Sequence, residues 1–368
     1  MSVSDLPLAG LKVVAIEQAV AAPFCTSRLA DAGAEVIKIE RPEGDFARGY
    51  DQAAAGQSSY FVWLNRGKTS LTLDLSTDHG KAELEGLLAD ADVLIQNLKR
   101  GALARLGFDP QRLARDHPRL IVCSITGYGE SGPLADRKAY DLLVQAESGL
   151  CSITGGPSEP SRVGISIVDI ATGSTAYSAI LEALIRRANT GKNAVVSVAM
   201  FDVMADWLTA PLLNHEGGYT PVRIGMAHPS IAPYGVFTAK DGETVLISVQ
   251  SDREWSKLAR DFLGKPELAD DPRFATNVAR VANRADTDAL VAEGFARLDS
   301  AAAIQALLSA DVALARVNDM ESLSKHPHLR RITVDTPNGP VSMPAPAPIF
   351  ANEERRYGPV PALKLPQE

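Results

Sequence analysis

The chain has 368 residues, of which 45% are apolar and 22% charged, the composition of an ordinary globular protein rather than a disordered one. This length exceeds that of a usual single core, so two domains are expected. The formal net charge of −8 disfavours sequence-independent binding of nucleic acid, which depends on clustered Lys and Arg. The start has no signal-peptide pattern and no apolar stretch is long enough for a membrane span, so we expect a cytoplasmic protein without a membrane partner.

The first 200 residues alternate between strand-like and helix-like segments, which is typical of βαβ units on a parallel sheet. Strands are predicted at 11–17, 35–40, 70–75, 92–96 and 120–125, and helices at 23–33, 78–89 and 172–185. The class of this half is therefore α/β.

A different pattern begins near Gly225. The residues around Asp241-Gly242 predict a hairpin between strands at 235–239 and 244–248, because Asp-Gly suits a type I′ turn. Ser251 and Glu254 form a capping box ahead of a helix that reaches residue 263. A small α+β domain is therefore expected after the larger one. The proline-rich tail from residue 335 should run extended over a surface rather than form a core element.

Asp169 stands where an apolar, strand-like run meets a helix of small residues. A strand-to-helix turn would expose its carboxylate to a cleft, and the N–H groups of the first helical turn would keep it ionised. The pattern suits a nucleophile. From the local pattern alone the plainer interpretation is an ordinary N-cap, since Asp is among the best capping residues.

Three other patterns indicate what kinds of ligand to expect. Residues 127–132 match G-x-G-x-x-G, but Pro133 follows and the first βα turn has no glycine, so no NAD site is expected. Neither the six histidines nor the three cysteines have the spacing of metal ligands, so no metal is expected. Basic residues recur at the ends of the predicted strands, where they form either a site for a phosphate-bearing ligand or a solvated rim.

Several longer strings carry a resemblance to a known family: Leu29-Ala-Asp-Ala-Gly-Ala-Glu-Val-Ile-Lys-Ile-Glu-Arg-Pro, Leu64-Asn-Arg-Gly-Lys-Thr-Ser-Leu-Thr-Leu-Asp-Leu and Thr126-Gly-Tyr-Gly-Glu-Ser-Gly-Pro. Through them the chain resembles the class III (family III, CaiB/BaiF-type) CoA-transferases, which also include the 2-methylacyl-CoA racemases. The resemblance implies a homodimer of interlocked rings. It also implies a large Rossmann-like domain, 1–200 completed by 328–368, a linker at 201–224 and a small domain at 225–325.

The resemblance also implies roles for single residues. The family's nucleophilic aspartate falls on Asp169, and Tyr140 matches a tyrosine that lines the active site of the transferases. Residues that match CoA-contacting positions are Arg41, Lys68, Asn97, Arg105 and Lys138. Further candidates for the lining of the site are Gly225, in a loop that could supply oxyanion donors, and Arg48 and His228, which could meet a distal carboxylate. Val20 departs from the family, because the formyl-CoA transferases carry a functional glutamine there.

The expected activity is transfer of coenzyme A from an acyl-CoA donor, with succinyl-CoA the first candidate, to a carboxylic acid, through an aspartyl anhydride and an aspartyl-CoA thioester. Val20 argues against oxalate and formate, and the surrounding strings resemble the subgroup that acts on succinyl, itaconyl, mesaconyl or citramalyl groups. Two alternatives remain. The first is a 2-methylacyl-CoA racemase, although Tyr140 stands where racemases carry a proton-transferring His. The second is a CoA-binding subunit without catalysis.

Overall fold

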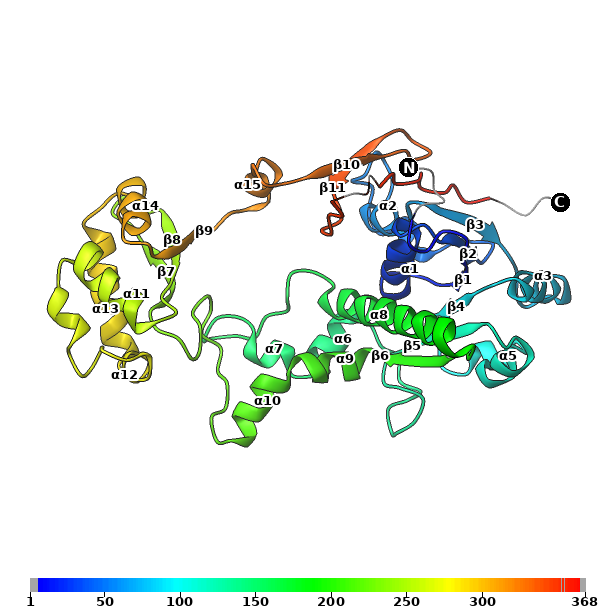
Figure 1. Cartoon of the computed structure of the whole chain (residues 1–368), viewed down its shortest axis with the longest axis horizontal. Coiled ribbons are helices and arrows are strands. Elements are labelled where there is room, and N and C mark those ends of the chain that lie inside the picture. The colour runs from blue at the N-terminus through cyan, green and yellow to red at the C-terminus, as the bar shows by residue number, and fades with distance from the viewer. Residues whose placement is uncertain (1–5, 352, 354, 365–368) are drawn as a thin grey trace. The chain divides into compact units, whose positions relative to one another are not determined.

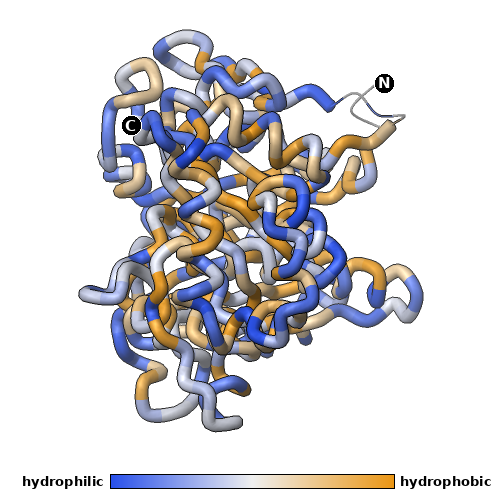
Figure 2. Tube along the Cα trace, turned by 90° about the vertical axis from the view of Figure 1, so that its left-hand side faces the viewer, coloured by the Kyte–Doolittle hydropathy of each residue, from blue (hydrophilic) through white to orange (hydrophobic). Residues whose placement is uncertain are grey.

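The computed structural model describes residues 6–351, 353 and 355–364. These residues form two compact units (Figure 1). The first contains the described residues up to 151, residues 162–213 and the chain from 330 onward, and the second contains residues 152–161 and 214–329. Hydropathy changes sign repeatedly along the trace (Figure 2). None of the helices in the described residues is both long and apolar enough to cross a membrane.

A six-stranded, fully parallel sheet forms the centre of the first unit, in the order β3-β2-β1-β4-β5-β6. Its strands are β1 (Lys12–Ile16), β2 (Glu35–Glu40), β3 (Lys68–Thr72), β4 (Val93–Gln96), β5 (Ile121–Thr126) and β6 (Val195–Ala199). The predicted α/β class is confirmed, and the strand order is that of a Rossmann fold. The third strand begins and ends earlier than predicted, at Lys68 and Thr72 rather than at residues 70 and 75.

Alternate residues of each strand point to opposite faces of the sheet. Val13 and Ala15 pack with the helices α1 (Ala21–Asp31) and α8 (Ile167–Thr190). Val14 and Ile16 pack on the other face, under α3 (Asp78–Ala89), α4 (Ala102–Arg105) and α5 (Pro110–Asp116). Both faces of the sheet are therefore covered, as parallel sheets require.

Helices α1 and α8 pack unusually closely at Gly173. A Cβ atom at this position would lie 2.4 Å from the carbonyl oxygen of Ala21 and 3.0 Å from Cβ of Phe24. Only glycine permits this approach, since real Cβ atoms do not come so near a backbone oxygen. The small residue fixes the first turns of α8 against the turn that follows β1.

Helix α8 begins earlier than predicted, and no strand leads into it. It starts at Ile167 rather than at residue 172, and the residues just before it are irregular. The apolar run has no strand to pair with, because β6 occupies the sheet position beside β5. Asp169 therefore lies within the first helical turn, and Ser166 holds the N-cap position. The strand-to-helix turn at Asp169 was a wrong prediction.

The other elements of the first unit connect or extend this core. They are the 3-10 turn Phe46–Gly49, α2 (Ser59–Asn65), α6 (Asp141–Glu147), α9 (Met200–Trp207), β10 (Arg331–Val334) and β11 (Val341–Pro344), while α7 (Leu150–Ile153) and α10 (Thr209–Glu216) each cross a boundary between the two units. The expected linker at 201–224 is thus largely helical, and only residues 217–224 lack regular structure.

The proline-rich tail is more than a surface segment. Its strand β11 pairs antiparallel with β10, which ends directly before the tail, and Val360 is buried with Phe61, Val62 and Met343 in a small apolar cluster. The expectation that the tail contributes nothing to a core was wrong. The prolines of the tail do not interrupt the pairing of Val341 with Val334. Pro344 stands at the last position of β11, where a strand tolerates a proline.

The second unit contains a three-stranded antiparallel sheet and a helical layer over it. The strands are β7 (Tyr234–Thr238), β8 (Thr244–Ser248) and β9 (Ala313–Arg316), and the helices and turns are α11 (Asp252–Lys257), the π-helical turn Leu258–Leu263, the 3-10 turn Pro266–Ala269, α12 (Asn277–Ala282), α13 (Arg284–Ala296), α14 (Ser300–Ser309) and α15 (Met320–Ser324). The predicted hairpin is confirmed, and Ser251 caps α11 by accepting a hydrogen bond from the N–H of Glu254. The second half of the predicted capping box differs, because the Glu254 carboxylate accepts from the N–H of Gln250. The turn is not type I′, because Gly242 has a positive φ but Asp241 does not.

Candidate active site

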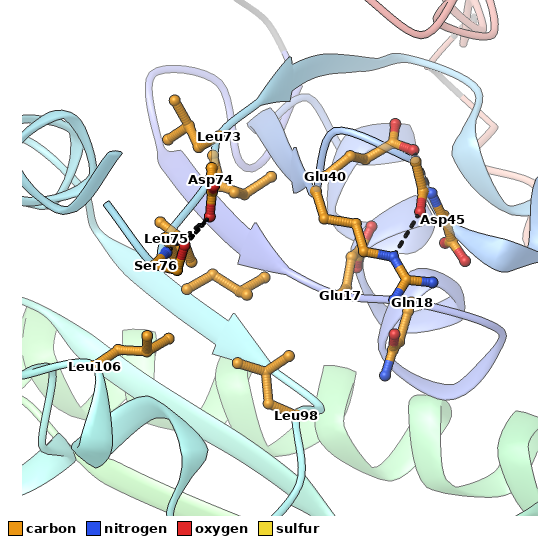
Figure 3. A pocket seen from close by; sticks show the side chains of 14 residues that line it. Glu17, Gln18, Glu40, Asp45, Leu73, Asp74, Leu75, Ser76, Leu98 and Leu106 are labelled. Atoms are coloured by element: carbon orange, nitrogen blue, oxygen red, sulfur yellow. Dashed lines mark hydrogen bonds between the residues drawn. The ribbon is translucent and has the colours of Figure 1, made fainter. Parts of the chain in front are cut away.

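A pocket of about 260 Å³ opens at the carboxyl ends of β1, β2 and β3 and beside the loop after β4 (Figure 3). Its lining consists of Ile16, Glu17, Gln18, Ile39, Glu40, Arg41, Gly44, Asp45, Leu73, Asp74, Leu75, Ser76, Leu98 and Leu106. The strand order reverses between β1 and β4, and ligands of open α/β sheets bind at such a reversal. The four leucines provide apolar walls, and Arg41 provides a positive charge.

Arg41 and Arg105 lie where the sequence predicted, near this pocket. The Arg41 side chain is 57% exposed, and its Nε donates a hydrogen bond to the Gly44 carbonyl at 3.1 Å. Arg105 is exposed at the end of α4 and directly precedes Leu106 of the pocket lining. Both guanidinium groups are accessible to a phosphate-bearing ligand.

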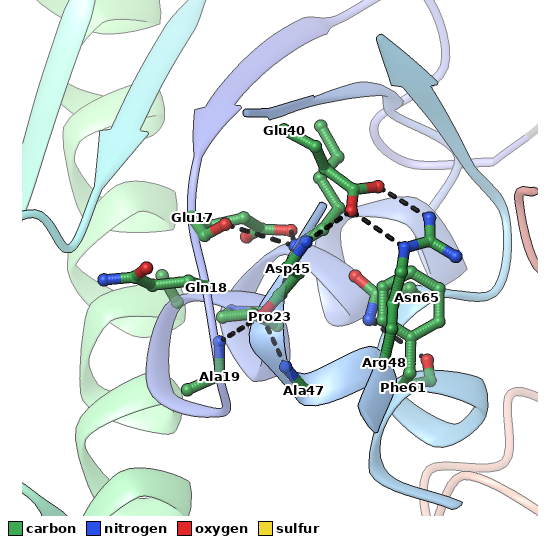
Figure 4. Close-up of polar contacts among 12 residues, drawn as sticks. Glu17, Gln18, Ala19, Pro23, Glu40, Asp45, Ala47, Arg48, Phe61 and Asn65 are labelled. Carbon is green, nitrogen blue, oxygen red and sulfur yellow. Dashed lines mark hydrogen bonds and ion pairs between the residues drawn. The ribbon is translucent and has the colours of Figure 1, made fainter. Parts of the chain in front are cut away.

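A buried network of charges adjoins the pocket and includes Glu17 and Asp45 of its lining (Figure 4). Lys68 Nζ lies 2.7 Å from Glu17 Oε1, and Lys38 Nζ lies 2.8 Å from Asp45 Oδ2 and 3.5 Å from Glu17. All four side chains are fully buried, and their charges sum to zero. Burial lowers the pKa of Lys68 to about 8 against the opposing effect of Glu17. Burial also opposes the ionisation of Glu17, but Lys68 and Lys38 outweigh it and lower the Glu17 pKa.

Lys68 was predicted to contact CoA, and the structure gives its ammonium group other partners. Besides Glu17, it donates to the Pro23 carbonyl and to Asn65 Oδ1. In this arrangement Lys68 supports the floor of the pocket and does not face it.

Asn97 and Asp45 hold the turn between β1 and α1. The amide of Asn97 pairs with both backbone groups of Gln18, at 3.0 and 2.8 Å. Asp45 Oδ1 accepts from the N–H groups of Ala19 and Ala47. Ala19 has a φ of 62°, which a side chain disfavours, so these bonds maintain a strained turn beside the pocket. Asn97 therefore shapes the site through Gln18.

Arg48 is also occupied, in an ion pair with Glu40. Its Nε and one terminal nitrogen lie 2.9 and 2.7 Å from the two Glu40 oxygens, and its guanidinium lies 3.7 Å above the Phe61 ring. Burial opposes the ionisation of Glu40, but hydrogen bonds from Arg48 and Ser70 lower its pKa to about 2. A substrate carboxylate would have to displace Glu40 to reach Arg48.

Asp169 has the chemistry of a reactive carboxylate. Burial raises its pKa to about 7, and the charge of Asp141 adds to this effect. Asp141 Oδ1, not Asp169, accepts from the N–H groups of Val168 and Asp169, at 2.8 and 3.2 Å. The expectation that the helix N-terminus keeps Asp169 ionised was therefore wrong, because a neighbouring carboxylate occupies those donors.

Several residues that the sequence did not indicate lie around Asp169. The side chain of Tyr50 has a pKa raised to about 12 by burial and then by Asp45, Asp169 and Tyr140, so these acidic groups share one environment. Tyr60 lies 3.3 Å from Ser166 at the start of α8, and its ring meets that of Tyr50 edge-on at 5.7 Å.

Residue 20 and residue 140 also border this environment. Val20 packs in an apolar cluster with Phe24 and Leu64, against Ile170 next to Asp169. Tyr140 is 60% exposed and directly precedes Asp141. The string that drew attention to Tyr140 thus also contained Asp141, while no local pattern marked Tyr50.

The remaining candidates are Lys138, Gly225 and His228. Lys138 is exposed in the loop before α6. Gly225 and His228 belong to the second unit, where the N–H of Gly225 donates to the Gly155 carbonyl and the His228 ring stacks on Tyr234 at 5.3 Å. The Gly225 N–H is therefore already engaged within its unit.

Comparison with known proteins adds to this geometry. The profile of CoA-transferase family III matches residues 8–364. The chain is 36% identical to succinate–glutarate CoA-transferase of Agrobacterium fabrum, over 94% of this chain and 90% of the relative. It is 37% identical to acetyl-CoA:oxalate CoA-transferase of Acetobacter aceti, over 92% of this chain and 87% of the relative. A CaiB/BaiF family protein from Brucella suis has a crystal structure with a TM-score of 0.80 at 38% identity, covering 95% of this chain and 94% of that one.

The fold and its pocket define a parallel α/β protein with a candidate ligand site at the sheet reversal. The chain belongs to CoA-transferase family III, and it is a CoA-transferase by that membership. Such enzymes use CoA thioesters and carboxylic acids as substrates. The predicted resemblance is confirmed.

Proposed function

We propose that the enzyme transfers CoA from an acyl-CoA donor to a dicarboxylic acid by way of covalent intermediates on Asp169. The observation that carries this proposal is a partly buried carboxylate with a pKa raised to about 7, set beside acidic and phenolic groups. A desolvated carboxylate is a stronger nucleophile than one in water, and covalent catalysis divides one acyl exchange into easier steps.

In the first step an Asp169 oxygen attacks the thioester carbonyl of the donor. The carbon–sulfur bond breaks, the CoA thiolate leaves, and a mixed anhydride remains on Asp169. The thiolate then attacks the Asp169 carbonyl carbon of this anhydride. The bond between this Asp169 carbon and the bridging oxygen breaks. The first carboxylic acid leaves with that oxygen, and Asp169 carries a CoA thioester.

The acceptor acid reverses these steps. Its carboxylate attacks the aspartyl thioester and expels the thiolate, which gives a second anhydride. The thiolate attacks the acceptor's acyl carbon, so a new acyl-CoA leaves and the Asp169 carboxylate is restored. Each step needs hydrogen-bond donors near the developing oxyanion, and one such donor is worth about 2.7–4 kcal/mol.

The pocket at the ends of β1, β2 and β3 suits the nucleotide part of CoA. Leu73, Leu75, Leu98 and Leu106 offer apolar walls for an adenine ring, and Arg41 and Arg105 can meet phosphate groups at the rim. Binding energy gained there, far from the reacting carbon, holds the thioester in position for attack. Arg41→Ala should raise the dissociation constant of CoA about tenfold, as loss of one charge-assisted phosphate contact does. Arg253→Ala, in the second unit, is the charge-matched control.

The acceptor is proposed to be a dicarboxylic acid, since the Agrobacterium relative is named for succinate and glutarate and the Acetobacter relative for oxalate. Succinyl-CoA is the proposed donor. Val20 stands beside the start of α8, at the position where the formyl-CoA transferases carry a glutamine. An apolar side chain there favours longer acids over oxalate.

We also propose a homodimer. In the first unit, α9 and α10 leave Trp207, Leu212 and Leu213 exposed by 55%, 49% and 61%. Large apolar side chains gathered on neighbouring helices are typical of an association surface. Sedimentation equilibrium at micromolar concentration should give twice the mass of the chain, and a monomer would contradict the proposal.

The activity itself is tested by offering succinyl-CoA with glutarate, mesaconate, itaconate, citramalate or oxalate and identifying the CoA products by mass spectrometry. A new acyl-CoA that forms only when an acid is present supports transfer. Because an Asp169 pKa near 7 also suits a general base, a parallel reaction of a 2-methylacyl-CoA in heavy water is needed. Deuterium uptake without any acceptor acid would indicate a racemase instead. Binding of CoA without either reaction would indicate a non-catalytic subunit.

A further inference from the structure

Helix α6 carries two polar side chains one turn apart, Asp141 and Gln145, and both are tied to the chain that enters α8. Gln145 is 0% exposed, and its Nε2 donates to Asp141 Oδ2 at 2.6 Å. Burying an amide costs free energy unless the amide is hydrogen-bonded. The buried Gln145 amide therefore needs these hydrogen bonds, and losing them would leave polar groups unpaired on both sides.

The other atoms of Gln145 reach the segment before α8. Gln145 Oε1 accepts from the N–H of Val163 at 2.9 Å, and Nε2 lies 3.5 Å from the Ile165 carbonyl. Asp141 completes the connection by accepting from Val168 and Asp169. Two side chains of α6 therefore hold the chain at four points between Val163 and Asp169.

Other contacts also constrain this segment: the Tyr60 hydroxyl lies 3.3 Å from Ser166 Oγ, and Val168 is buried in the core of the first unit. Residues 161–166 have no regular structure, and Ile165 is 53% exposed. The bonds from α6 therefore act together with these contacts and with the close approach at Gly173 to fix the first turn of α8, on which Asp169 stands. Attack on a thioester requires reacting atoms about 3–3.5 Å apart, and an error of about 1 Å can lower a rate about a hundredfold.

We propose that Gln145 is a positioning residue for the exchange reaction: through Asp141 and the Val163 segment, it fixes the turn of α8 from which Asp169 attacks. The proposal rests on the proposed function, in which Asp169 is acylated. Gln145 itself touches neither substrate nor nucleophile in this arrangement.

The test compares wild type with Gln145→Met, Gln145→Glu and Val144→Ala. The measured quantity is the single-turnover rate of acyl transfer to Asp169 from saturating succinyl-CoA, with hydroxylamine trapping, beside the dissociation constant of CoA. Gln145→Met keeps the size of the side chain and removes all its hydrogen bonds. Gln145→Glu should stay protonated, because burial and Asp141 both disfavour its charge, so it can still donate to Asp141 and accept from Val163.

We expect Gln145→Met to lower the rate about 10- to 100-fold with CoA binding unchanged within about twofold, as loss of a supporting hydrogen bond does at other sites. Gln145→Glu should recover a rate within about tenfold of wild type. Val144→Ala removes a fully buried apolar group from the same helix, so it should lower stability but leave the rate near wild type. This control separates positioning from a general loss of packing.

A wild-type rate in Gln145→Met, or equal losses in the Met and Glu variants, would overturn the proposal. If Gln145→Met does not fold, Asp141→Ala and Asp141→Asn replace the pair, because Asn retains an oxygen for the Val168 and Asp169 N–H groups and Ala does not. A wild-type rate in Asp141→Ala, or equal losses in the Ala and Asn variants, would then overturn the proposal. If wild type itself forms no adduct, the proposed function fails and this inference fails with it, whereas an adduct that is insensitive to Gln145 defeats the inference alone.

Discussion

At the scale of single residues, the proposed mechanism depends on one carboxylate, Asp169, whose surroundings disfavour its charge. Burial and Asp141 raise the pKa of Asp169 to about 7, while Arg48 and Ser70 overcome burial at Glu40 and lower its pKa to about 2. Two carboxylates of one unit thus have opposite properties because their hydrogen-bond donors differ. Glu40 receives donors, and the donors nearest to Asp169 serve Asp141.

The pH dependence of catalysis follows from this. Asp169 attacks as a carboxylate, so kcat/KM for the acyl-CoA should be low at about pH 5.5, rise through a midpoint near 7 and level off above about pH 8. Initial rates of acyl exchange across this range measure the profile. A rate independent of pH over the same range would show that the ionisation of Asp169 does not limit attack.

Stability should respond in the opposite sense. The Asp169 pKa is higher in the folded protein than the value of about 3.9 in an unfolded chain, so the folded state binds more protons between about pH 4 and 7 and loses stability as the pH rises through this window. An asparagine at position 169 does not ionise, so Asp169→Asn does not lose stability as the pH rises. Its free energy of unfolding should exceed that of wild type by about 1–2 kcal/mol at pH 8, after allowance for solvent screening. Urea unfolding at pH 5 and pH 8 measures the difference. A variant less stable than wild type at pH 8 contradicts the assignment.

At the scale of elements, the contact between α1 and α8 sets the position of the site. Gly173→Ala would bring a methyl group to within 2.4 Å of the Ala21 carbonyl, so the helices must separate, at a cost of about 1–3 kcal/mol. Gly86→Ala in α3 is the matched control, since a Cβ there meets nothing within 4 Å and alanine favours a helix by about 1 kcal/mol. Thermal unfolding should thus move in opposite directions in the two variants. A Gly173→Ala variant as stable as wild type would contradict the packing described.

The turn after β1 depends in a similar way on the buried charges. Glu17→Gln removes the carboxylate that faces both Lys68 and Lys38, and breaking such a buried pair costs about 3–5 kcal/mol. Glu293→Gln removes an exposed partner of Lys265 and should leave stability close to that of wild type. Urea unfolding of both variants distinguishes a buried network from a surface pair, and equal effects would contradict the burial of the network.

The sequence predicted most of these elements but not all of their roles. The strand around Val13 follows from a continuous apolar run, the strand around Ile37 from Val36, Ile37 and Ile39, and the hairpin of β7 and β8 from Asp-Gly between them. The start of α8 did not follow, because alternating apolar residues before Asp169 resemble a strand when no information on pairing is present. Lys68 could not be distinguished from a ligand contact, since its partner Glu17 is 51 residues away in sequence.

At the scale of the whole molecule, the chain belongs to CoA-transferase family III, and one parallel α/β unit contains both the pocket at the sheet reversal and Asp169, whose pKa is raised to about 7. The sequence resemblance correctly identified the family. It could not identify Tyr50 or Gln145, because their relevance arises from contacts with Asp169 and Asp141 that form only in the folded chain. The second unit contains the candidate residues Gly225 and His228, whose part in catalysis stays a prediction.

The most direct test of the central claim is mass spectrometry of the peptide that contains Asp169 after incubation with succinyl-CoA and hydroxylamine, without an acceptor acid. An acylated aspartate reacts with hydroxylamine, so wild type should carry a hydroxamate on Asp169, and Asp169→Asn should carry none. Turnover to a new acyl-CoA without any hydroxamate on Asp169, or with one on another residue, would contradict the account.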